Sequence, residues 1–373
     1  MKILIVYTNY GTGHTSAATA LKEELSNKDK TLEVELLDIL TYSRPVINFL
    51  FKKTGKLMAT KFRNSRLKLY NKKMYKITKK SKFANFCTKL FWTKKLKNQI
   101  NDFKPDLIVS TQVGPTYMLL KQKHKIGNPK IGTVFTDYGL HNWHLLGNND
   151  IDYYFVPTKD IKKQMVDLSI SEDKIYVTGV PISKDFKPTL NRKEEVTKQY
   201  SLEKHEALLL FVAGGGLGYG NSLPYFKELL NITLPFSYIF VAGKNEKLQK
   251  KAELMAKSST KKGIVLGYTK EMATLLSASD LLIGKPGGLI TTEAIQMNTP
   301  ICAVEPIPGQ ELKNIDFIIG NNFGIYPQNI TDFRNDIENI LKNKDILQKM
   351  KICLEQYQIK NGSESIAKVL LKK

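Results

Sequence analysis

Short apolar runs alternate with segments of helical periodicity along the first half of the chain. Ile3–Tyr7 predicts a buried strand, and the segment after the following glycine turn predicts a helix from about Thr15 to Leu25. Further apolar runs predict strands over Leu32–Leu37, Asp106–Ser110, Ile131–Thr136 and Tyr153–Val156. Strands that alternate with helices are typical of a parallel sheet with crossover connections.

The same alternation begins again at Ala207. Its apolar runs predict strands over Leu208–Ala213, Tyr238–Ala242, Ile264–Leu266, Leu281–Ile283 and Ile301–Val304. We therefore predict an α/β chain of two domains, 1–182 and 207–345, joined by a polar linker over 183–206. The last helices, 346–373, could fold back on the first domain. Two parallel-sheet domains predict a ligand in the cleft between them, at the carboxyl ends of the strands.

A basic and aromatic insertion, about 43–100, separates the second predicted strand from the third. Between Asp38 and Asp102 the chain has no Asp or Glu, but it has 18 Lys and Arg from Arg44 to Lys97. Apolar residues at helical spacing predict two or three amphipathic helices here. An anionic membrane surface attracts such a mixture of positive charge and aromatic side chains. The residues expected to meet the membrane are Lys52, Lys53, Lys72, Lys73, Phe86, Phe91 and Trp92.

Other features of the sequence narrow the location and the partners. No apolar run approaches the roughly 20 residues that span a bilayer, and the N-terminus lacks the pattern of a secretory signal. The three cysteines lie far apart, which favours reduced thiols in a cytoplasm. We expect a peripheral protein on the cytoplasmic face of the cell membrane. No nucleic-acid partner is expected, because the insertion lacks a reader motif. A solvated, lysine-rich helical surface is the plain alternative, but it does not explain the missing acids.

Two glycine-rich turns follow buried strands of the second domain. Gly214, Gly215 and Gly216 follow the first strand there, and glycine lets a backbone approach a phosphate closely. The second turn, in Gly284-Lys-Pro-Gly-Gly-Leu-Ile-Thr-Thr-Glu293, opens a helix whose free N–H groups favour a phosphate. Glu293 is expected in the first turn of that helix, where its carboxylate can accept from both hydroxyls of a ribose. Alternatively, it only complements the helix dipole.

Five motifs occur along the chain in a characteristic order. They are Gly11-Thr-Gly-His14-Thr-Ser-Ala17, Thr136-Asp-Tyr-Gly-Leu-His141-Asn-Trp143, Gly179-Val-Pro-Ile182, Lys285-Pro-Gly-Gly-Leu with Thr-Glu-Ala294, and Pro308-Gly-Gln-Glu311 with Asn314. Together they resemble the family of monogalactosyldiacylglycerol synthases and processive diacylglycerol glucosyltransferases. The resemblance covers nearly the whole chain. It implies the GT-B fold with two Rossmann-like domains, a UDP-sugar substrate held mainly by the second domain, and inversion without a metal or any other cofactor.

The resemblance also implies roles for individual residues. His14 would be the general base or an acceptor-site residue, and Asp137 would be a second catalytic residue, lining the acceptor side. An imidazole can take the proton of an attacking alcohol near neutral pH. The acceptor side would include Gly13, His141 and Trp143. The donor would be held by Gly214, Gly215, Gly216, Tyr268, Pro286, Gly287, Gly288, Thr291, Thr292, Glu293, Gln310, Glu311 and Asn314. Tyr10 departs from the family pattern, which often has a third glycine there.

The expected function is transfer of a hexose, with glucose as the first choice, from a UDP-sugar to diacylglycerol at an anionic membrane. The transfer could be repeated on the same lipid. One alternative is a related GT-B transferase with another lipid acceptor, in galactolipid synthesis or with undecaprenyl-linked muramyl peptide. Another is a non-catalytic, UDP-binding regulator. The sequence does not separate glucose from galactose, which differ in the orientation of one hydroxyl.

Two further patterns are weak. Gly11-x-Gly13-x-x-Ser16 after a strand is a partial dinucleotide fingerprint, but its third glycine is missing, so NAD binding is not expected. Asp150 and Asp152 have the spacing of a metal-binding carboxylate pair. They merely precede a predicted strand here, and we expect no metal ligands in the chain.

Overall fold

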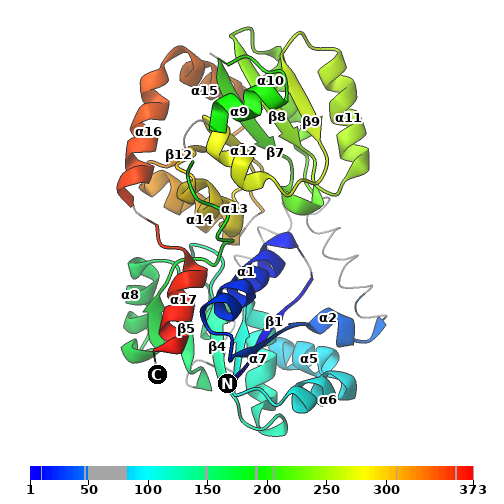
Figure 1. The fold of residues 1–373 in the computed structure, drawn as a ribbon, viewed down its shortest axis with the longest axis vertical. Coiled ribbons are helices and arrows are strands. Elements are labelled where there is room, and N and C mark those ends of the chain that lie inside the picture. Colours follow the sequence, from blue (N-terminus) through cyan, green and yellow to red (C-terminus); the bar gives the residue numbers. More distant parts are fainter. Residues whose placement is uncertain are drawn as a thin grey trace. The chain divides into compact units, whose positions relative to one another are not determined.

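The computed structural model describes residues 1–9, 11–45, 48, 82–147, 150–189, 192–204, 206–307, 309–357 and 359–372 (Figure 1). The chain divides into two compact units. The first unit comprises Met1–Lys184, Pro308–Gln310 and Lys360–Lys373, and the second comprises Asp185–Ile307 and Glu311–Ile359. Among the described residues, each unit contains one six-stranded sheet, so the predicted α/β class with two parallel-sheet domains is confirmed. The cleft expected between the two domains stays a prediction.

The first sheet has the strand order β2-β1-β3-β4-β5-β6, with every neighbouring pair parallel. Its strands are β1 (Lys2–Tyr7), β2 (Glu33–Asp38), β3 (Leu107–Ser110), β4 (Lys130–Val134), β5 (Tyr153–Val156) and β6 (Ile175–Val177). From β1 the chain winds to β2 on one side, and it then continues from β3 outward on the other side. The carboxyl ends of β1 and β3 therefore form a topological switch point, where ligands bind in open α/β sheets.

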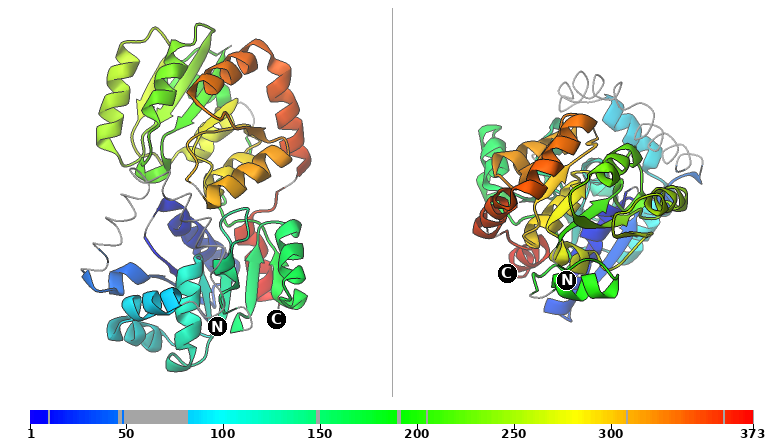
Figure 2. Two further views of the ribbon diagram at one scale, coloured as in Figure 1. Left: turned by 180° about the vertical axis from the view of Figure 1, so that it is seen from behind. Right: turned by 90° about the horizontal axis from the view of Figure 1, so that it is seen from above.

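Helices cover both faces of the first sheet. They are α1 (Thr12–Lys28), α2 (Ile39–Tyr42), α5 (Lys82–Phe91), α6 (Lys94–Phe103), α7 (Val113–Gln122), η2 (Lys123–Lys125), η3 (Asn142–Leu145), α8 (Lys159–Asp167), η5 (Glu172–Lys174) and α17 (Gly362–Leu371). On one face α1 and α17 pack side by side, as Figure 2 also shows. On the other face α6 and α7 pack against β1, β3 and β4.

The sequence of α6 illustrates how these helices form. Leu96, Ile100 and Phe103 recur at helical spacing, and all three are buried in the core. The hydroxyl of Thr93 caps the helix by accepting the N–H of Leu96. At the other end, Lys104 adopts the left-handed conformation typical of a helix C-terminus. The buried stripe attaches this end of the basic insertion firmly to the first unit.

The second sheet has the strand order β12-β11-β10-β7-β8-β9, again with every pair parallel. Its strands are β7 (Ala207–Val212), β8 (Phe236–Val241), β9 (Gly263–Leu266), β10 (Leu281–Gly284), β11 (Ile301–Ala303) and β12 (Gly324–Ile325). Its helices are α9 (Arg192–Gln199), η6 (Gly215–Leu217), α10 (Leu223–Asn231), α11 (Glu246–Lys257), α12 (Met272–Ala278), α13 (Gly288–Gln296), α14 (Gln310–Gly320), α15 (Ile330–Lys342) and α16 (Lys344–Tyr357). The switch point of this sheet lies between β7 and β10.

The structure adds elements that the apolar pattern did not predict. The segment 183–206, predicted as a polar linker, contains α9, which packs against α12 of the second unit. Two short edge strands, β6 and β12, were also not predicted. The last two helices belong to different units: α16 lies in the second unit and α17 in the first.

The part of the basic insertion that the structure describes belongs to the fold of the first unit. Phe91 and Trp92, which were expected to meet a membrane, instead pack against the core formed by α6, α7 and the sheet. Phe86 fits the expectation better, because it is 60% exposed. Lys52, Lys53, Lys72 and Lys73 lie outside the described residues. None of the described helices combines the length and the apolar character that crossing a bilayer requires.

Candidate functional site

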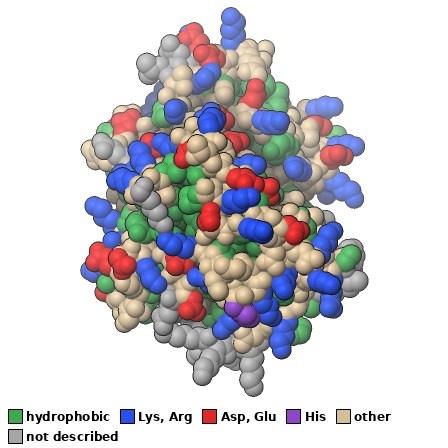
Figure 3. All heavy atoms as spheres, turned by 60° about the horizontal axis from the view of Figure 1, so that its bottom comes forward, with side chains coloured by type: hydrophobic (Ala, Val, Ile, Leu, Met, Phe, Trp, Pro, Cys, Tyr) green, Lys and Arg blue, Asp and Glu red, His purple; other side chains and the backbone are tan. Residues whose placement is uncertain are grey.

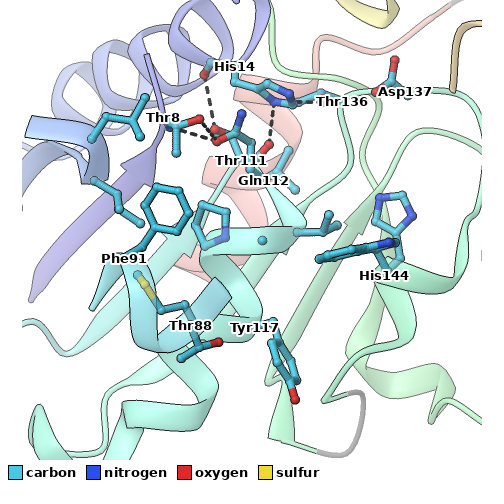
Figure 4. Close-up of a pocket in the computed structure, with 18 of the residues that line it drawn as sticks. Thr8, His14, Thr88, Phe91, Thr111, Gln112, Tyr117, Thr136, Asp137 and His144 are labelled. Atoms are coloured by element: carbon cyan, nitrogen blue, oxygen red, sulfur yellow. Dashed lines mark hydrogen bonds between the residues drawn. The ribbon is translucent and has the colours of Figure 1, made fainter. Parts of the chain in front are cut away.

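His14 lies at the switch point of the first sheet, in the first turn of α1 and directly after Gly13. Its Nδ1 is 2.8 Å from the carbonyl oxygen of Thr111, which follows β3 (Figure 4). A carbonyl oxygen only accepts, so Nδ1 carries the proton of the neutral ring and Nε2 keeps a lone pair. Among the described residues, none forms a hydrogen bond with Nε2. The arrangement therefore orients Nε2 as a base.

The protonation state of His14 follows from its surroundings. Burial lowers the pKa of the imidazole below its ordinary value of 6.5. The negative charge of Asp137 and the hydrogen bond to Thr111 counteract part of this shift by raising the pKa. At pH 7 the ring is therefore neutral, which is the state that a general base needs. Asp137 follows β4 and Thr136, whose hydroxyl lies 3.3 Å from Nδ1 of His14.

A cavity of about 390 Å³ in the first unit begins at His14. Figure 4 shows His14 and Thr136 at one end of the cavity, with Thr88 and Tyr117 at the other. Most of its walls are apolar. They include Leu40, Phe91, Val113, Pro115, Met118 and Trp143.

His141 and His144 form a stack with Phe135 beside this cavity. The ring of His144 lies 3.8 Å from that of Phe135 and 3.7 Å from that of His141, between centroids. Burial lowers the pKa of His141 to about 4, although Asp137 raises it in part. Burial and the neighbouring His141 lower the pKa of His144 well below its ordinary value. Both rings are therefore neutral at pH 7, and they form an uncharged wall near the base.

The second candidate site lies at the switch point of the second sheet, where two glycine turns meet. Gly214 follows β7 in the left-handed conformation, with φ 66°. A Cβ there would lie 2.2 Å from the carbonyl oxygen of Tyr219, so only glycine fits this turn. After β10, α13 begins at Gly288, and neither a side-chain cap nor an acid occupies its first turn. The free N–H groups of that turn can receive an anion.

Buried polar contacts fix the turn before α13. The side-chain amide of Asn314, which is fully buried, donates to the carbonyl oxygen of Pro286 at 2.9 Å. Glu311 forms an ion pair with Lys285 at 2.7 Å, and its other oxygen accepts the N–H of Ile307. Glu311 was expected to hold the donor. Both of its oxygens already have protein partners, so it also helps to hold the turn in place.

Thr291 and Thr292 are fully buried in α13. The hydroxyl of Thr292 donates to the carbonyl oxygen of Gly288 at 2.7 Å, so this donor is used within the helix. The hydroxyl of Thr291 has no hydrogen-bond partner among the described residues. Of the two, only Thr291 has its hydroxyl available for a ligand.

Glu293 is the sixth residue of α13, so it lies in the second turn of the helix. The prediction that it lies in the first turn was wrong. This makes complementation of the helix dipole a weaker explanation, because that effect falls off after the first turn. Desolvation raises the pKa of its carboxyl to about 8. Within the described chain, the carboxyl group forms neither a hydrogen bond nor an ion pair. A poorly solvated carboxyl group without partners is favourable in a folded protein when a ligand supplies donors.

The remaining donor residues divide between the two units. Tyr268 follows β9 and is 56% exposed, and the ammonium of Lys244 lies 5.0 Å from its ring centroid. Gly215 and Gly216 belong to the short helix η6. Gln310 is the first residue of α14 but belongs to the first unit, where its side-chain amide lies 3.0 Å from Nε2 of His141.

Comparisons with known proteins show which family the chain resembles. Residues 14–182 match the family model described as monogalactosyldiacylglycerol (MGDG) synthase. The chain is 27% identical to a processive diacylglycerol beta-glucosyltransferase of Bacillus pumilus, over 98% of this chain and 93% of the relative. It is 29% identical to one of Staphylococcus aureus, over 99% of this chain and 92% of the relative. The predicted family resemblance is confirmed.

Solved structures show the same fold at lower identity. MurG of Acinetobacter baumannii is similar with a TM-score of 0.66 and 14% identity, covering 100% of this chain and 99% of that one. MnaA of S. aureus, solved with UDP, is similar with a TM-score of 0.64 and 15% identity, covering 99% and 95%. The GT-B architecture that the resemblance implied is therefore confirmed.

Sequence reasoning missed several polar residues at the two sites. Thr111 and Gln112 follow β3 at the switch point, and their position directly after a buried strand was the available signal. Glu305 follows β11 with φ 53° and accepts the N–H of Asn221 beside the Gly214 turn, at 2.7 Å.

Asp152, one of the two carboxylates with metal-binding spacing, accepts from Lys123 and from the N–H of Ile131, so it has structural partners. Within the described ranges, no group of three His, Cys, Asp or Glu side chains could hold a metal ion.

Proposed function

We propose that this chain is an inverting glycosyltransferase that moves a hexose, glucose in the first place, from a UDP-sugar to diacylglycerol. The observation that carries this proposal is the similarity, over nearly the whole chain, to relatives named processive diacylglycerol beta-glucosyltransferases. A β-linked product from an α-linked UDP-glucose requires inversion at the anomeric carbon. Repeated transfer to the same lipid is part of the proposal.

The proposed reaction is a single displacement. The free hydroxyl of diacylglycerol lies at Nε2 of His14, which accepts its proton as the oxygen bonds to the anomeric carbon. The bond from that carbon to the diphosphate oxygen breaks in the same step, and UDP leaves with the electron pair. Neutral His14, with its proton on Nδ1, is prepared for this role. No metal or other cofactor takes part in the proposed step.

The donor is proposed to bind at the switch point of the second sheet. The first-turn N–H groups of α13 and the Gly214–Gly216 turn receive the diphosphate and stabilise the charge of the leaving group. Glu293 accepts from the two ribose hydroxyls, which supply the donors that its carboxyl group lacks in the described protein. Tyr268, exposed after β9, faces the uracil.

Attachment to an anionic membrane is a further part of the proposal. The net charge of +22 favours adsorption to anionic lipid, and the stretch without acids contributes 18 of the Lys and Arg. Figure 3 shows Lys and Arg side chains spread over the face that it draws. Phe86 on α5 adds an exposed aromatic side chain within this stretch.

Purified protein is expected to release UDP from UDP-glucose only when diacylglycerol vesicles are present, and to form a glucosyldiacylglycerol that mass spectrometry detects. UDP-galactose run in parallel identifies the preferred hexose. The rate is expected to stay unchanged in EDTA, since the mechanism uses no metal. Transfer to undecaprenyl-linked muramyl peptide but not to diacylglycerol would identify the other acceptor, and UDP binding without any turnover would contradict the proposal.

Vesicles that contain anionic lipid are expected to sediment with the protein, whereas zwitterionic vesicles leave most of it in solution. At about 1 kcal/mol per basic residue near an anionic surface, a few engaged lysines suffice for reversible binding. Raising the salt concentration from 0.1 M to 1 M should release the protein, because the Debye length falls from about 10 Å to about 3 Å. Equal sedimentation with both kinds of vesicle would contradict an electrostatic attachment.

A further inference from the structure

The cavity beside His14 has the character of a compartment for a hydrocarbon chain. Its volume of about 390 Å³ falls within the range of small-molecule sites, about 300–1,000 Å³. Away from His14, the walls come mainly from apolar side chains of α5 and α7, including Phe91, Val113 and Met118. Water binds poorly in such a space, because it needs two to four polar partners.

Gln112 supplies a fixed polar group in the cavity wall. Its Oε1 accepts the backbone N–H of Thr8 at 2.9 Å and the hydroxyl of Thr8 at 2.6 Å. Because a backbone N–H can only donate, the amide atom that faces the N–H of Thr8 is the oxygen. The Nε2 group therefore has two hydrogens to donate, and none of the described residues accepts either of them. Figure 4 shows Gln112 close to His14, so an acceptor atom bound there would lie near the base.

Helix α5 connects this cavity with the exposed surface. Thr88 and Phe91 of α5 line the cavity, whereas Phe86 of the same helix is 60% exposed. The helix belongs to the stretch that has no Asp or Glu. A lipid chain that leaves an anionic bilayer would therefore meet apolar side chains both on the outer surface and on the inner surface of α5.

We propose that the cavity holds one acyl chain of the acceptor and that Gln112 donates to its ester carbonyl, which positions the free hydroxyl at Nε2 of His14. An ester carbonyl is an acceptor without hydrogens, which matches the two unused N–H bonds of the amide. The inference rests on the proposed function and adds where the acceptor binds and which residue positions it. Gln112 is a positioning residue in this arrangement, since it takes no part in the proton transfer.

Gly114→Leu tests the occupancy of the cavity. Gly114 lies in the first turn of α7, lines the cavity, and a Cβ built there meets nothing within 4 Å. The open space at this position can accept the larger side chain, so the variant should fold. We expect binding of radiolabelled dioctanoylglycerol, measured without any UDP-sugar, to weaken at least tenfold. Gly320→Leu is the matched control, because Gly320 ends α14 on the surface with equally open space.

Gln112→Glu tests the amide donor. A carboxylate can still accept both hydrogens of Thr8, but it cannot donate to an ester. The wild-type protein should bind dioctanoylglycerol at least fivefold more tightly than 1,2-di-O-octylglycerol, an ether that lacks both carbonyls. In the variant this preference for the ester should disappear. If Gln112 had a purely structural role, the variant would bind both ligands more weakly by the same factor.

The outcomes separate this inference from the proposed function. Loss of dioctanoylglycerol binding in Gly114→Leu supports the inference even if no UDP-hexose is turned over, and in that case only the proposed function fails. Normal transfer and normal lipid binding in Gly114→Leu overturn the inference and leave the function intact. Equal competition by a polyprenyl phosphate, or an unchanged ester preference in Gln112→Glu, overturns the acylglycerol assignment.

Discussion

Replacing His14 by alanine is expected to lower the rate of sugar transfer roughly 10²- to 10⁴-fold, the usual contribution of a general base. The geometry predicts a specific loss. The carbonyl oxygen of Thr111 holds the proton on Nδ1, and Nε2 is the only basic atom of the ring that remains. Affinity for UDP should stay within a factor of two of wild type, because His14 belongs to the first unit and the glycine turns belong to the second.

The measurement combines calorimetry with UDP and a transfer assay with UDP-glucose and diacylglycerol vesicles. His124→Ala is the matched control, since His124 is exposed on η2 and does not line the cavity. It should change neither UDP affinity nor transfer. Near-normal transfer by His14→Ala would remove His14 from the proton transfer and leave it as a residue that only lines the acceptor site.

The pH dependence of the same reaction tests the role of Asp137. Its charge raises the pKa of His14, although burial keeps the final value below 6.5. The acid side of the profile of kcat/KM should therefore have its midpoint below pH 6.5. In Asp137→Asn the raising effect is lost, so the midpoint should move to a still lower pH, and transfer on the plateau should slow as the base weakens.

The buried strands were predictable because each fills the interior of a sheet. β7 is a fully apolar run, β8 is interrupted only by the buried Ser237, and β1 differs only at its ends. The edge strands β6 and β12 have only three and two residues, which is too short for a pattern to identify. Helix α9 was missed because only Val196 and Thr197 are buried in an otherwise polar sequence.

The location of both candidate sites could be predicted, but the detailed state of their residues could not. His14 and Gly214 follow the first strand of their sheets, which lies at the switch point in each case. The orientation of the His14 ring depends on Thr111, which is 97 positions away along the chain. The environment of Glu293 depends on packing around α13. The prediction from sequence placed Glu293 one helical turn too early. The strands around each site therefore depend on local pattern, whereas the chemistry within it depends on distant contacts.

Replacing Glu293 by glutamine is expected to weaken UDP binding by an amount that grows with pH. Hydrogen bonds to a charged group contribute about 1.5–3 kcal/mol each, so losing this carboxylate should cost roughly 100-fold in affinity at pH 9. Burial raises the pKa of Glu293 to about 8, so at pH 7 most of the free protein carries the neutral acid. At pH 7 the carboxyl group must first lose its proton before it can accept from the ribose, and one pH unit below its pKa this costs about 1.4 kcal/mol. The wild type should therefore bind UDP only roughly tenfold more tightly than Glu293→Gln at pH 7.

The direction of the effect follows from linkage. Ribose hydroxyls donate to the ionised carboxylate and lower its pKa, so UDP binding releases a proton and the affinity rises with pH up to about 8. UDP itself also titrates, but subtracting the profile of Glu293→Gln removes that contribution. Glu355→Gln, at an exposed position on α16, is the control and should follow the wild type.

Stability without ligand supplies an independent readout of the same carboxyl group. Its pKa is higher in the folded protein than in the unfolded chain, where it is near 4.5. The unfolded chain therefore loses this proton first, and the wild type should lose stability relative to Glu293→Gln as the pH rises from about 4.5 to about 8. Denaturant titrations at pH 5 and pH 9 measure this difference. If the wild type and Glu293→Gln differed by the same amount at every pH, in both UDP affinity and stability, Glu293 would be an ordinary ionised carboxylate. That result would contradict the proposed contact between Glu293 and the ribose.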